Sequence, residues 1–180
     1  MASSNASRPD HLVLADLQAT LELGANLARL WLDLPPEARP ILLLEGDLGA
    51  GKTFFVSELF RAMGSLVPAV SPTFPVVNTL QLRSVYNGVD KICHLDLYRL
   101  KSSDEMLQLG LELEVTNQSL VLLEWPENID SEGWEKFFKW TRCKKPKRAI
   151  SVHIDRAEAP EERNYRLRLL NSFEWWRESN

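Results

Sequence analysis

The sequence contains few cysteines, few glycines and no long hydrophobic run. Only two of its 180 residues are cysteine and eight are glycine. Cys93 and Cys143, without a CxxC pair or a Cys/His cluster, exclude a disulfide scaffold and a zinc finger and suit a reducing compartment. No stretch reaches the roughly 18 apolar residues of a membrane span, and the first ten residues have no apolar signal region. We therefore expect a soluble, cytoplasmic protein that has no membrane partner.

Charge is nearly balanced overall but uneven along the chain. The 21 basic and 25 acidic residues give a net charge of −4, which argues against a surface that binds a phosphate backbone throughout. Seven basic residues and no acid lie between Lys136 and Arg148. Trp134 lies just before these basic residues, and Phe137, Phe138 and Trp140 lie among them. The segment suits nucleic-acid contact or a protein partner, but an amphipathic helix packed on the domain is favoured.

One domain accounts for most of the chain. A chain of this length can bury roughly 70% of its unfolded surface in one core. No repeat and no linker-like composition divides it. We expect a flexible N-terminal segment over 1–10, a single domain over 11–172 with a basic aromatic insert at 130–148, and a C-terminal tail over 173–180.

Hydrophobic patterns in the first part of the chain predict strand, helix, strand and helix in turn. His11 to Ala15 is a short apolar run, and Asp16 is a good N-cap for a helix that Pro35 and Pro36 end. Ile41 to Glu45 is an unbroken aliphatic run, typical of a strand buried on both faces of a parallel sheet. A helix from Lys52 to about Met63 follows, with Gly64 as its C-terminal stop.

The rest of the chain predicts further strands and short helices. Asn87-Gly88 indicates a tight turn between two antiparallel strands, the second over Lys91–Leu97. Ser102 and Glu105 form a capping box for a short helix through Gln108. The remaining predicted elements are strands at Leu120–Glu124, Ile150–Ile154 and Tyr165–Leu169 and a helix at Trp134–Trp140. Buried strands that alternate with helices predict an α/β layered sheet with an antiparallel flank.

A glycine-rich loop lies between the Ile41–Glu45 strand and the following helix. Residues 46–53 match G-x-x-x-x-G-K-[ST], the phosphate-binding loop of P-loop proteins. Their residues are Gly46, Asp47, Leu48, Gly49, Ala50, Gly51, Lys52 and Thr53. Backbone N–H groups of such a loop and the positive end of the helix bind phosphates, while Lys52 reaches the β- and γ-phosphates of ATP and Thr53 ligates Mg²⁺. The fold class is therefore a P-loop NTPase-like layered sheet with helices on both faces.

Two acidic residues lie at predicted strand ends. Glu124 closes the run LVLLE in the way a Walker-B acid does, and Asp96 follows the strand that starts at Lys91. Ligands of parallel sheets bind outside the carboxyl ends of the strands. One acid is expected to hold the magnesium and its water shell while the other orients the attacking water. His94, on the same strand as Asp96, is interpreted as a packed or partly exposed histidine rather than a base.

Four motifs in order resemble those of the TsaE (YjeE) family of small bacterial ATPases. They are GDLGAGKT, Ser71-Pro72-Thr73-Phe74, HLDLYRL at 94–100 and Leu123-Glu124-Trp125-Pro126. The resemblance covers about Leu12 to Pro126, with a weaker match around Arg166. It implies an Mg²⁺-dependent ATPase, slow alone and stimulated by partners. The family is required for threonylcarbamoylation of adenosine 37 in tRNAs that read codons beginning with A, works with TsaD and TsaB, and meets tRNA indirectly.

The resemblance also implies roles for individual residues. Asp96 is the acid needed for hydrolysis and acts with Lys52, and the magnesium ligands are Thr53 and Glu124. Ser71 and Thr73 lie in a switch-like loop near the γ-phosphate. The other implied nucleotide-binding residues, beyond those of the 46–53 loop, are Phe54, Trp125 and Arg166. Phe54 stands where the family has a second hydroxyl residue against the α-phosphate, and Pro75 stands where threonine is common.

Two other functions share this motif. A small-molecule P-loop kinase needs arginines in a lid to clamp the transferred phosphate, and Arg83, Arg99 and Arg142 do not fall in a clear lid segment. A nucleotide-gated binding module would bind ATP through the same residues without significant hydrolysis. The accessory ATPase is the favoured hypothesis.

Overall fold

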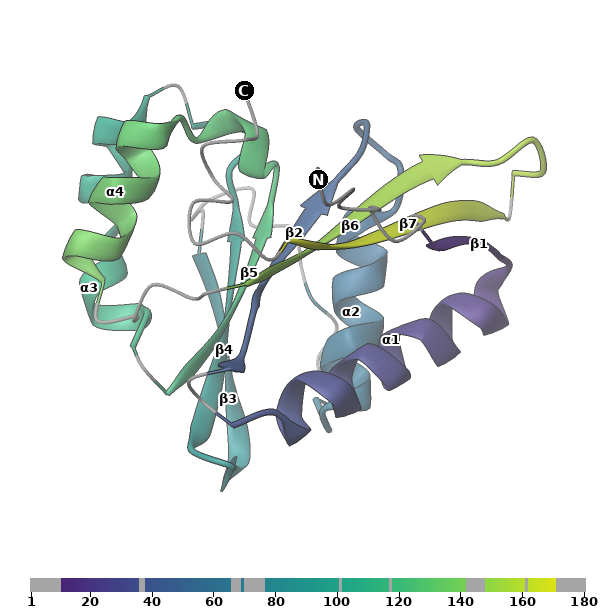
Figure 1. The fold of residues 1–180 in the computed structure, drawn as a ribbon, viewed down its shortest axis with the longest axis horizontal. Helices are drawn as coiled ribbons and strands as arrows, with labels where there is room; N and C mark the ends of the chain where they lie inside the picture. The colour runs from purple at the N-terminus through teal and green to yellow at the C-terminus, as the bar shows by residue number, and fades with distance from the viewer. Residues whose placement is uncertain are drawn as a thin grey trace, which may run out of the picture.

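Parallel strands form the centre of the sheet, and antiparallel strands flank them on both sides (Figure 1). The computed structural model describes residues 11–35, 38–65, 69, 77–100, 102–116, 118–141, 148–160 and 162–170. The strands are β1 (His11–Ala15), β2 (Ile41–Glu45), β3 (Val77–Tyr86), β4 (Val89–Asp96), β5 (Ser119–Glu124), β6 (Ala149–Arg156) and β7 (Arg163–Leu170). The helices are α1 (Leu17–Asp33), α2 (Lys52–Ala62), α3 (Leu111–Glu114) and α4 (Ser131–Trp140), with 3₁₀ helices η2 (Ser103–Leu109) and η3 (Pro126–Asn128).

Within these residues seven strands form one sheet in the order β1-β7-β6-β2-β5-β4-β3. β2 pairs in parallel with β5 and β6, and β4 pairs in parallel with β5. β7 pairs antiparallel with β1 and β6, and β3 pairs antiparallel with β4. The predicted P-loop-like layered sheet is confirmed, and antiparallel pairs extend it at both edges.

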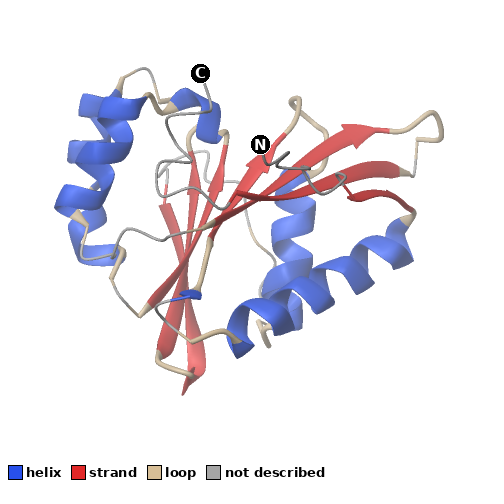
Figure 2. Ribbon diagram, viewed as in Figure 1, coloured by secondary structure: helices blue, strands red, loops and turns tan. Residues whose placement is uncertain are grey.

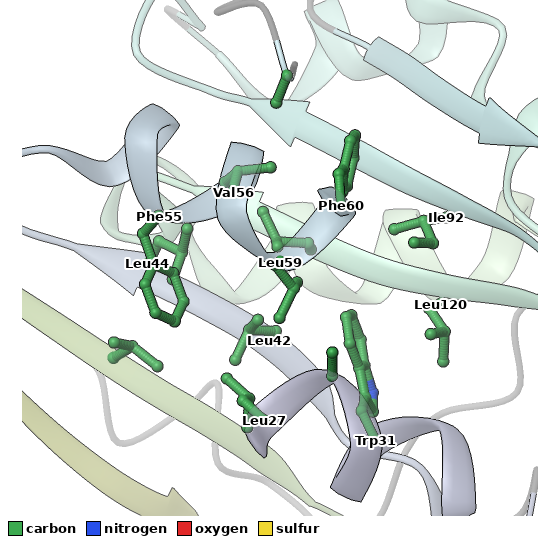
Figure 3. Packing of buried hydrophobic residues seen from close by; sticks show 14 of the residues in the cluster. Leu27, Trp31, Leu42, Leu44, Phe55, Val56, Leu59, Phe60, Ile92 and Leu120 are labelled. Atoms are coloured by element: carbon green, nitrogen blue, oxygen red, sulfur yellow. The ribbon is translucent and has the colours of Figure 1, made fainter. Parts of the chain in front are cut away.

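Helices cover both faces of the sheet (Figure 2). Alternate residues of β2 divide between the two sides, since successive side chains of a strand point to opposite faces. Leu42 and Leu44 pack with Trp31 of α1 and Phe55 of α2 (Figure 3). Ile41 and Leu43, which alternate with those two leucines along β2, belong to the cluster that α3, α4 and η2 cover. The unbroken aliphatic run of β2 is thus explained by burial on both sides.

The predicted hairpin is present, whereas the predicted capping box is wrong. Asn87 and Gly88 connect β3 to β4 with φ angles of 49° and 78°, the left-handed conformation that an Asn-Gly turn supplies. Ser102 occupies the N-cap position but makes no side-chain capping hydrogen bond, and the following segment, η2, is a 3₁₀ helix. The predicted terminal segments lie outside the described residues, as does 142–147 of the insert.

Helix α4 is the described part of the basic aromatic insert. It begins three residues before the predicted start because Asp130 is the N-cap, accepting a hydrogen bond from the Gly133 N–H at 2.7 Å. The side chains of Trp134, Phe137 and Phe138 are buried against the sheet. These aromatic groups therefore pack on the domain, where nucleic acid cannot stack on them.

Lys136 lies on the other side of α4 and is paired with acids. Its Nζ is 2.5 Å from Asp104 Oδ1 in η2 and 2.9 Å from Glu132 Oε1. Hydrogen bonds to these two carboxylates raise the pKa of Lys136 to about 12. This lysine connects α4 to η2.

No helix in the described ranges is both long and apolar enough to cross a membrane.

Candidate functional site

The glycine-rich loop connects the carboxyl end of β2 to the first turn of α2. Gly46, Gly49 and Gly51 have φ angles of 130°, 77° and 109°, which L side chains rarely adopt. A Cβ atom at Gly46 would collide with the carbonyl oxygen of Ile154. No side chain caps the start of α2, so the positive end of the helix dipole remains available for an anion.

Lys52 is the first residue of α2 and is 5% exposed. Its Nζ donates hydrogen bonds to the carbonyl oxygens of Gly46 at 2.5 Å and Asp47 at 3.0 Å. Burial lowers the pKa of Lys52 even though nearby carboxylates, led by Glu124, act to raise it. A phosphate bound beside the ammonium group would favour its charged form.

Trp125 lies against this lysine. The Lys52 Nζ is 3.7 Å from the centroid of the Trp125 ring, within cation–π distance. Trp125 has a φ of 60°. Its backbone N–H donates to the Leu44 carbonyl at 3.1 Å, and this hydrogen bond joins the end of β5 to β2. Its ring also packs against that of Tyr98, with centroids 4.9 Å apart. The structure thus brings Trp125 to the glycine-rich loop.

Thr53 and the two strand-end acids form the polar part of the site. The Thr53 hydroxyl donates to Glu124, with Oγ1 3.2 Å from Oε1 and 3.4 Å from Oε2. Asp96 pairs with Glu124 in the β4–β5 register, and its Oδ1 accepts the Tyr98 N–H at 3.1 Å. Both acids therefore lie side by side at the carboxyl ends of neighbouring strands, as predicted. Glu124 is 2% exposed. A carboxylate buried to this extent is costly unless hydrogen-bond donors such as the Thr53 hydroxyl stabilise it.

A buried histidine completes this group. His94 Nε2 lies 2.9 Å from Glu124 Oε1, and the His94 side chain has no solvent exposure. The interpretation of His94 as a packed side chain is confirmed, and the structure adds its contact with Glu124. The spacing of His94 and Asp96 puts both on the same face of one strand, but the pairing with Glu124 depends on which strand lies beside β4.

Two arginines that belong to none of the sequence motifs support the loop from outside. Arg163 Nε donates to the Ala50 carbonyl at 2.8 Å, and its Nη1 binds two carbonyls of its own hairpin. Arg156 makes longer hydrogen bonds to the carbonyls of Gly49 and Leu48, at 3.4 and 3.5 Å. A Cβ at Gly49 would lie 2.5 Å from the Arg156 Nη2. These contacts fix the orientation of the loop's peptide planes and so of its N–H groups.

Arg166, which the family resemblance assigns to nucleotide binding, forms an ion pair with Asp155. Its Nη2 donates to Asp155 Oδ2 at 2.8 Å, and Asp155 Oδ1 lies 3.0 Å from His153 Nε2. Partial burial acts to raise the pKa of Asp155, but hydrogen bonds from Arg166 and His153 outweigh it, so this pKa is lowered. The structure therefore places Arg166 in an ion pair beside the loop, with Arg156 and Arg163 closer to it.

The remaining predicted residues lie around the loop or outside the described ranges. Leu48 is 67% exposed at the loop, and Phe54 is 42% exposed in the first turn of α2. Ser71 and Thr73 fall outside the described residues. A cleft of about 520 Å³ opens next to the loop. Its lining includes Glu45, Gly46, Asp47, Trp125, Glu127 and His153. That volume is within the range of small-molecule sites.

Removal of the Arg163 guanidinium tests the support of the loop. We expect Arg163→Leu to weaken nucleotide binding about tenfold, the equivalent of one hydrogen bond from a charged donor. Arg163→Lys restores little, because one ammonium group cannot reproduce a planar fork that binds three carbonyls. Titration with a fluorescent ADP analogue measures the effect. Arg29→Leu, the same change on the exposed surface of α1, serves as the control, and equal affinities for Arg29→Leu and Arg163→Leu contradict the prediction.

Comparison with known protein families gives a consistent result. The model of the family described as "Threonylcarbamoyl adenosine biosynthesis protein TsaE" matches residues 14–164. A protein from Rickettsia felis named tRNA threonylcarbamoyladenosine biosynthesis protein TsaE is 44% identical over 119 residues, which cover 66% of this chain and 63% of the relative. A protein of the same name from Nostoc sp. is 38% identical, covering 66% of this chain and 68% of the relative. The chain spans between about half and two thirds of the length of the Rickettsia relatives.

A solved structure shows the same fold. The crystal structure of YdiB from Bacillus subtilis superposes with a TM-score of 0.53 at 21% identity, over 94% of this chain and 92% of YdiB. At this identity the likeness concerns the arrangement of helices and strands.

Proposed function

Because the chain belongs to the TsaE family, we propose that it is an ATP-hydrolysing accessory protein of tRNA threonylcarbamoylation. In this proposal it acts on the TsaD/TsaB complex and supports modification of adenosine 37 in tRNAs that read codons beginning with A. The curated relatives carry the name of tRNA threonylcarbamoyladenosine biosynthesis proteins. Contact with tRNA is indirect.

The observation that carries the proposal is the hydrogen bond between Thr53 and Glu124 at the end of a glycine-rich loop. This bond joins the last residue of the loop motif to the acid at the end of the neighbouring strand. Lys52 lies beside them with its ammonium group held by loop carbonyls. ATP phosphates would replace neutral carbonyl partners with charged ones, which bind an ammonium group more strongly.

The donor set fits Mg²⁺. No group of three or more His, Cys, Asp or Glu side chains in the described ranges is arranged to hold a metal by itself. Mg²⁺ needs no such cage, because it keeps several waters and binds through one or two protein oxygens together with substrate phosphates. The Thr53 hydroxyl and the Glu124 carboxylate are the oxygens that would hold it. When bound, the ion neutralises charge that develops on the phosphates.

The protein's own groups supply the rest of the proposed chemistry. Lys52 binds the transferred phosphoryl group electrostatically, and the loop N–H groups orient the phosphates. Asp96 ends β4, which β5 separates from β2, and it accepts a proton from the attacking water or orients it. Because the Lys52 ammonium group lies over the Trp125 ring, a change in the position of Lys52 on phosphate binding would act on the β5–η3 turn and so give partners a surface that reports the bound state.

Hydrolysis of Mg-ATP by the purified protein, alone and with TsaD and TsaB, tests the proposal. We expect slow turnover alone, a clear increase with the complex, and a loss of at least roughly 100-fold in Lys52→Ala, because that variant removes one electrostatic donor to the phosphates. Radioactive γ-phosphate follows the product. Phosphate transferred to a small acceptor identifies a kinase, and ATP binding without hydrolysis under either condition identifies a nucleotide-gated module. Either result rejects the accessory-ATPase proposal.

A further inference from the structure

His94 and Glu124 are a buried pair at the point where the proposed magnesium ligands meet. Their exposed side-chain fractions are 0% and 2%, and His94 Nε2 is 2.9 Å from Glu124 Oε1. The same carboxylate oxygen accepts the Thr53 hydroxyl at 3.2 Å. Two donors on separate elements, β4 and α2, therefore converge on one acid of β5.

The surroundings of His94 favour a proton on Nε2, the nitrogen that faces Glu124. Nε2 faces a carboxylate and so carries hydrogen, while the buried Nδ1 has no hydrogen-bond partner in the described part of the chain. A protonated Nδ1 would leave a buried N–H unsatisfied, which is costly. Phe60 packs edge-on against the imidazole, with centroids 6.1 Å apart. The ring is thus held with Nε2 directed at Glu124.

The strand register explains why this donor reaches the acid. Asp96 is directly opposite Glu124 in the parallel β4–β5 pair, and His94 is opposite Leu122. His94 and Asp96 lie two residues apart, so both side chains emerge on the same face of β4. β4 therefore carries both residues on one face. Asp96 lies at its carboxyl end, and His94 lies deeper in the sheet, against the Glu124 side chain.

We propose that His94 is a positioning residue that orients the Glu124 carboxylate toward Thr53 for magnesium. The proposal rests on the function proposed above, in which Thr53 and Glu124 hold the ion. A glutamate has three rotatable side-chain bonds, and a fixed donor removes that freedom before the metal arrives. Groups that hydrogen-bond metal ligands in this way affect metal affinity about 10- to 100-fold when they are replaced.

The experiment measures nucleotide affinity as a function of Mg²⁺ concentration. Fluorescent ADP analogue is titrated in EDTA and at a series of Mg²⁺ concentrations. We expect His94→Leu, which removes the donor, to raise the Mg²⁺ concentration for half-maximal enhancement at least tenfold and to change affinity in EDTA less than twofold. We expect His94→Gln, whose amide N–H reaches a similar position, to restore the Mg²⁺ requirement to within about threefold of the wild type.

Matched variants separate positioning from packing. Phe60→Leu loosens the contact with the imidazole without removing its N–H, and it should lower Tm while leaving the Mg²⁺ requirement unchanged. If His94→Leu does not fold, His94→Asn keeps a polar group that is too short to reach Glu124 and should give the same loss. An unchanged Mg²⁺ requirement in folded His94→Leu or His94→Asn, or an equal loss with and without Mg²⁺, overturns the inference. If the wild type shows no Mg²⁺ effect, the proposed function fails together with it.

Discussion

Replacing Asp96 with alanine is expected to reduce ATP turnover by at least roughly 100-fold and to keep Mg-ATP affinity within about threefold of the wild type. Asp96 ends β4 directly opposite Glu124, and its Oδ1 already accepts the Tyr98 N–H. The carboxylate is thus held at the sheet edge beside the proposed phosphate site. A group that only orients or deprotonates water contributes to the transition state and little to ground-state binding.

Single-turnover hydrolysis and equilibrium binding, measured on the same preparation, separate these two effects. Asp104→Ala is the matched control because it removes a carboxylate from the exposed surface of η2, where turnover should not change. Asp96→Asn keeps the size and the hydrogen-bond acceptor but loses the base, so it should resemble Asp96→Ala. Full turnover in Asp96→Ala would show that another group acts on the water. A parallel loss of Mg-ATP affinity would instead assign Asp96 to the metal.

Gly46→Ala is expected to destabilise the protein by about 3 kcal/mol or more and to abolish nucleotide binding. The residue has a φ of 130°, and its Cβ would collide with the carbonyl oxygen of Ile154. Ile154 belongs to β6, a direct neighbour of β2, so the backbone on neither side can move without breaking the central pairing. The loop entrance must therefore distort, and Lys52 loses the Gly46 carbonyl that holds it.

Gly64→Ala measures how much of the destabilisation of Gly46→Ala comes from the positive φ alone, without a collision. Gly64 also has a positive φ, of 88°, but a Cβ there meets nothing within 4 Å. We expect it to cost about 1 kcal/mol and to leave nucleotide binding unchanged. Urea denaturation gives both free energies of unfolding. Similar costs for the two variants would mean that the sheet accommodates the added methyl group at Gly46.

The sequence predicted most of the fold because the strongest patterns are local. An aliphatic run followed by a glycine-rich motif is sufficient to predict the β2–loop–α2 unit, and Asn87-Gly88 is sufficient to predict the hairpin. The errors arose where several local outcomes have similar energies. Ser102 with Glu105 suits an α-helical cap, yet the segment forms a 3₁₀ helix, and α4 starts at the less obvious cap of Asp130.

The candidate site was predictable only for residues within motifs. The positions of Lys52 and Thr53 follow from the loop pattern, and that of Glu124 from the end of an apolar strand. The contributions of His94 and Arg163 depend on which strands become neighbours, a property that hydrophobic periodicity does not contain. For both residues, the observed partner lies on a different element, far away along the chain.

The distance along the chain between Arg163 and the Ala50 carbonyl is 113 residues. During synthesis the glycine-rich loop leaves the ribosome long before the strand that supports it. Since β7 also completes the sheet between β6 and β1, a nascent chain that ends before Arg163 has the whole motif but lacks both this hydrogen bond and the strand that joins β1 to the sheet. In the proposed function the loop therefore reaches its full nucleotide affinity only once β7 has paired, and ATP is expected to stabilise chains in which this strand is in place.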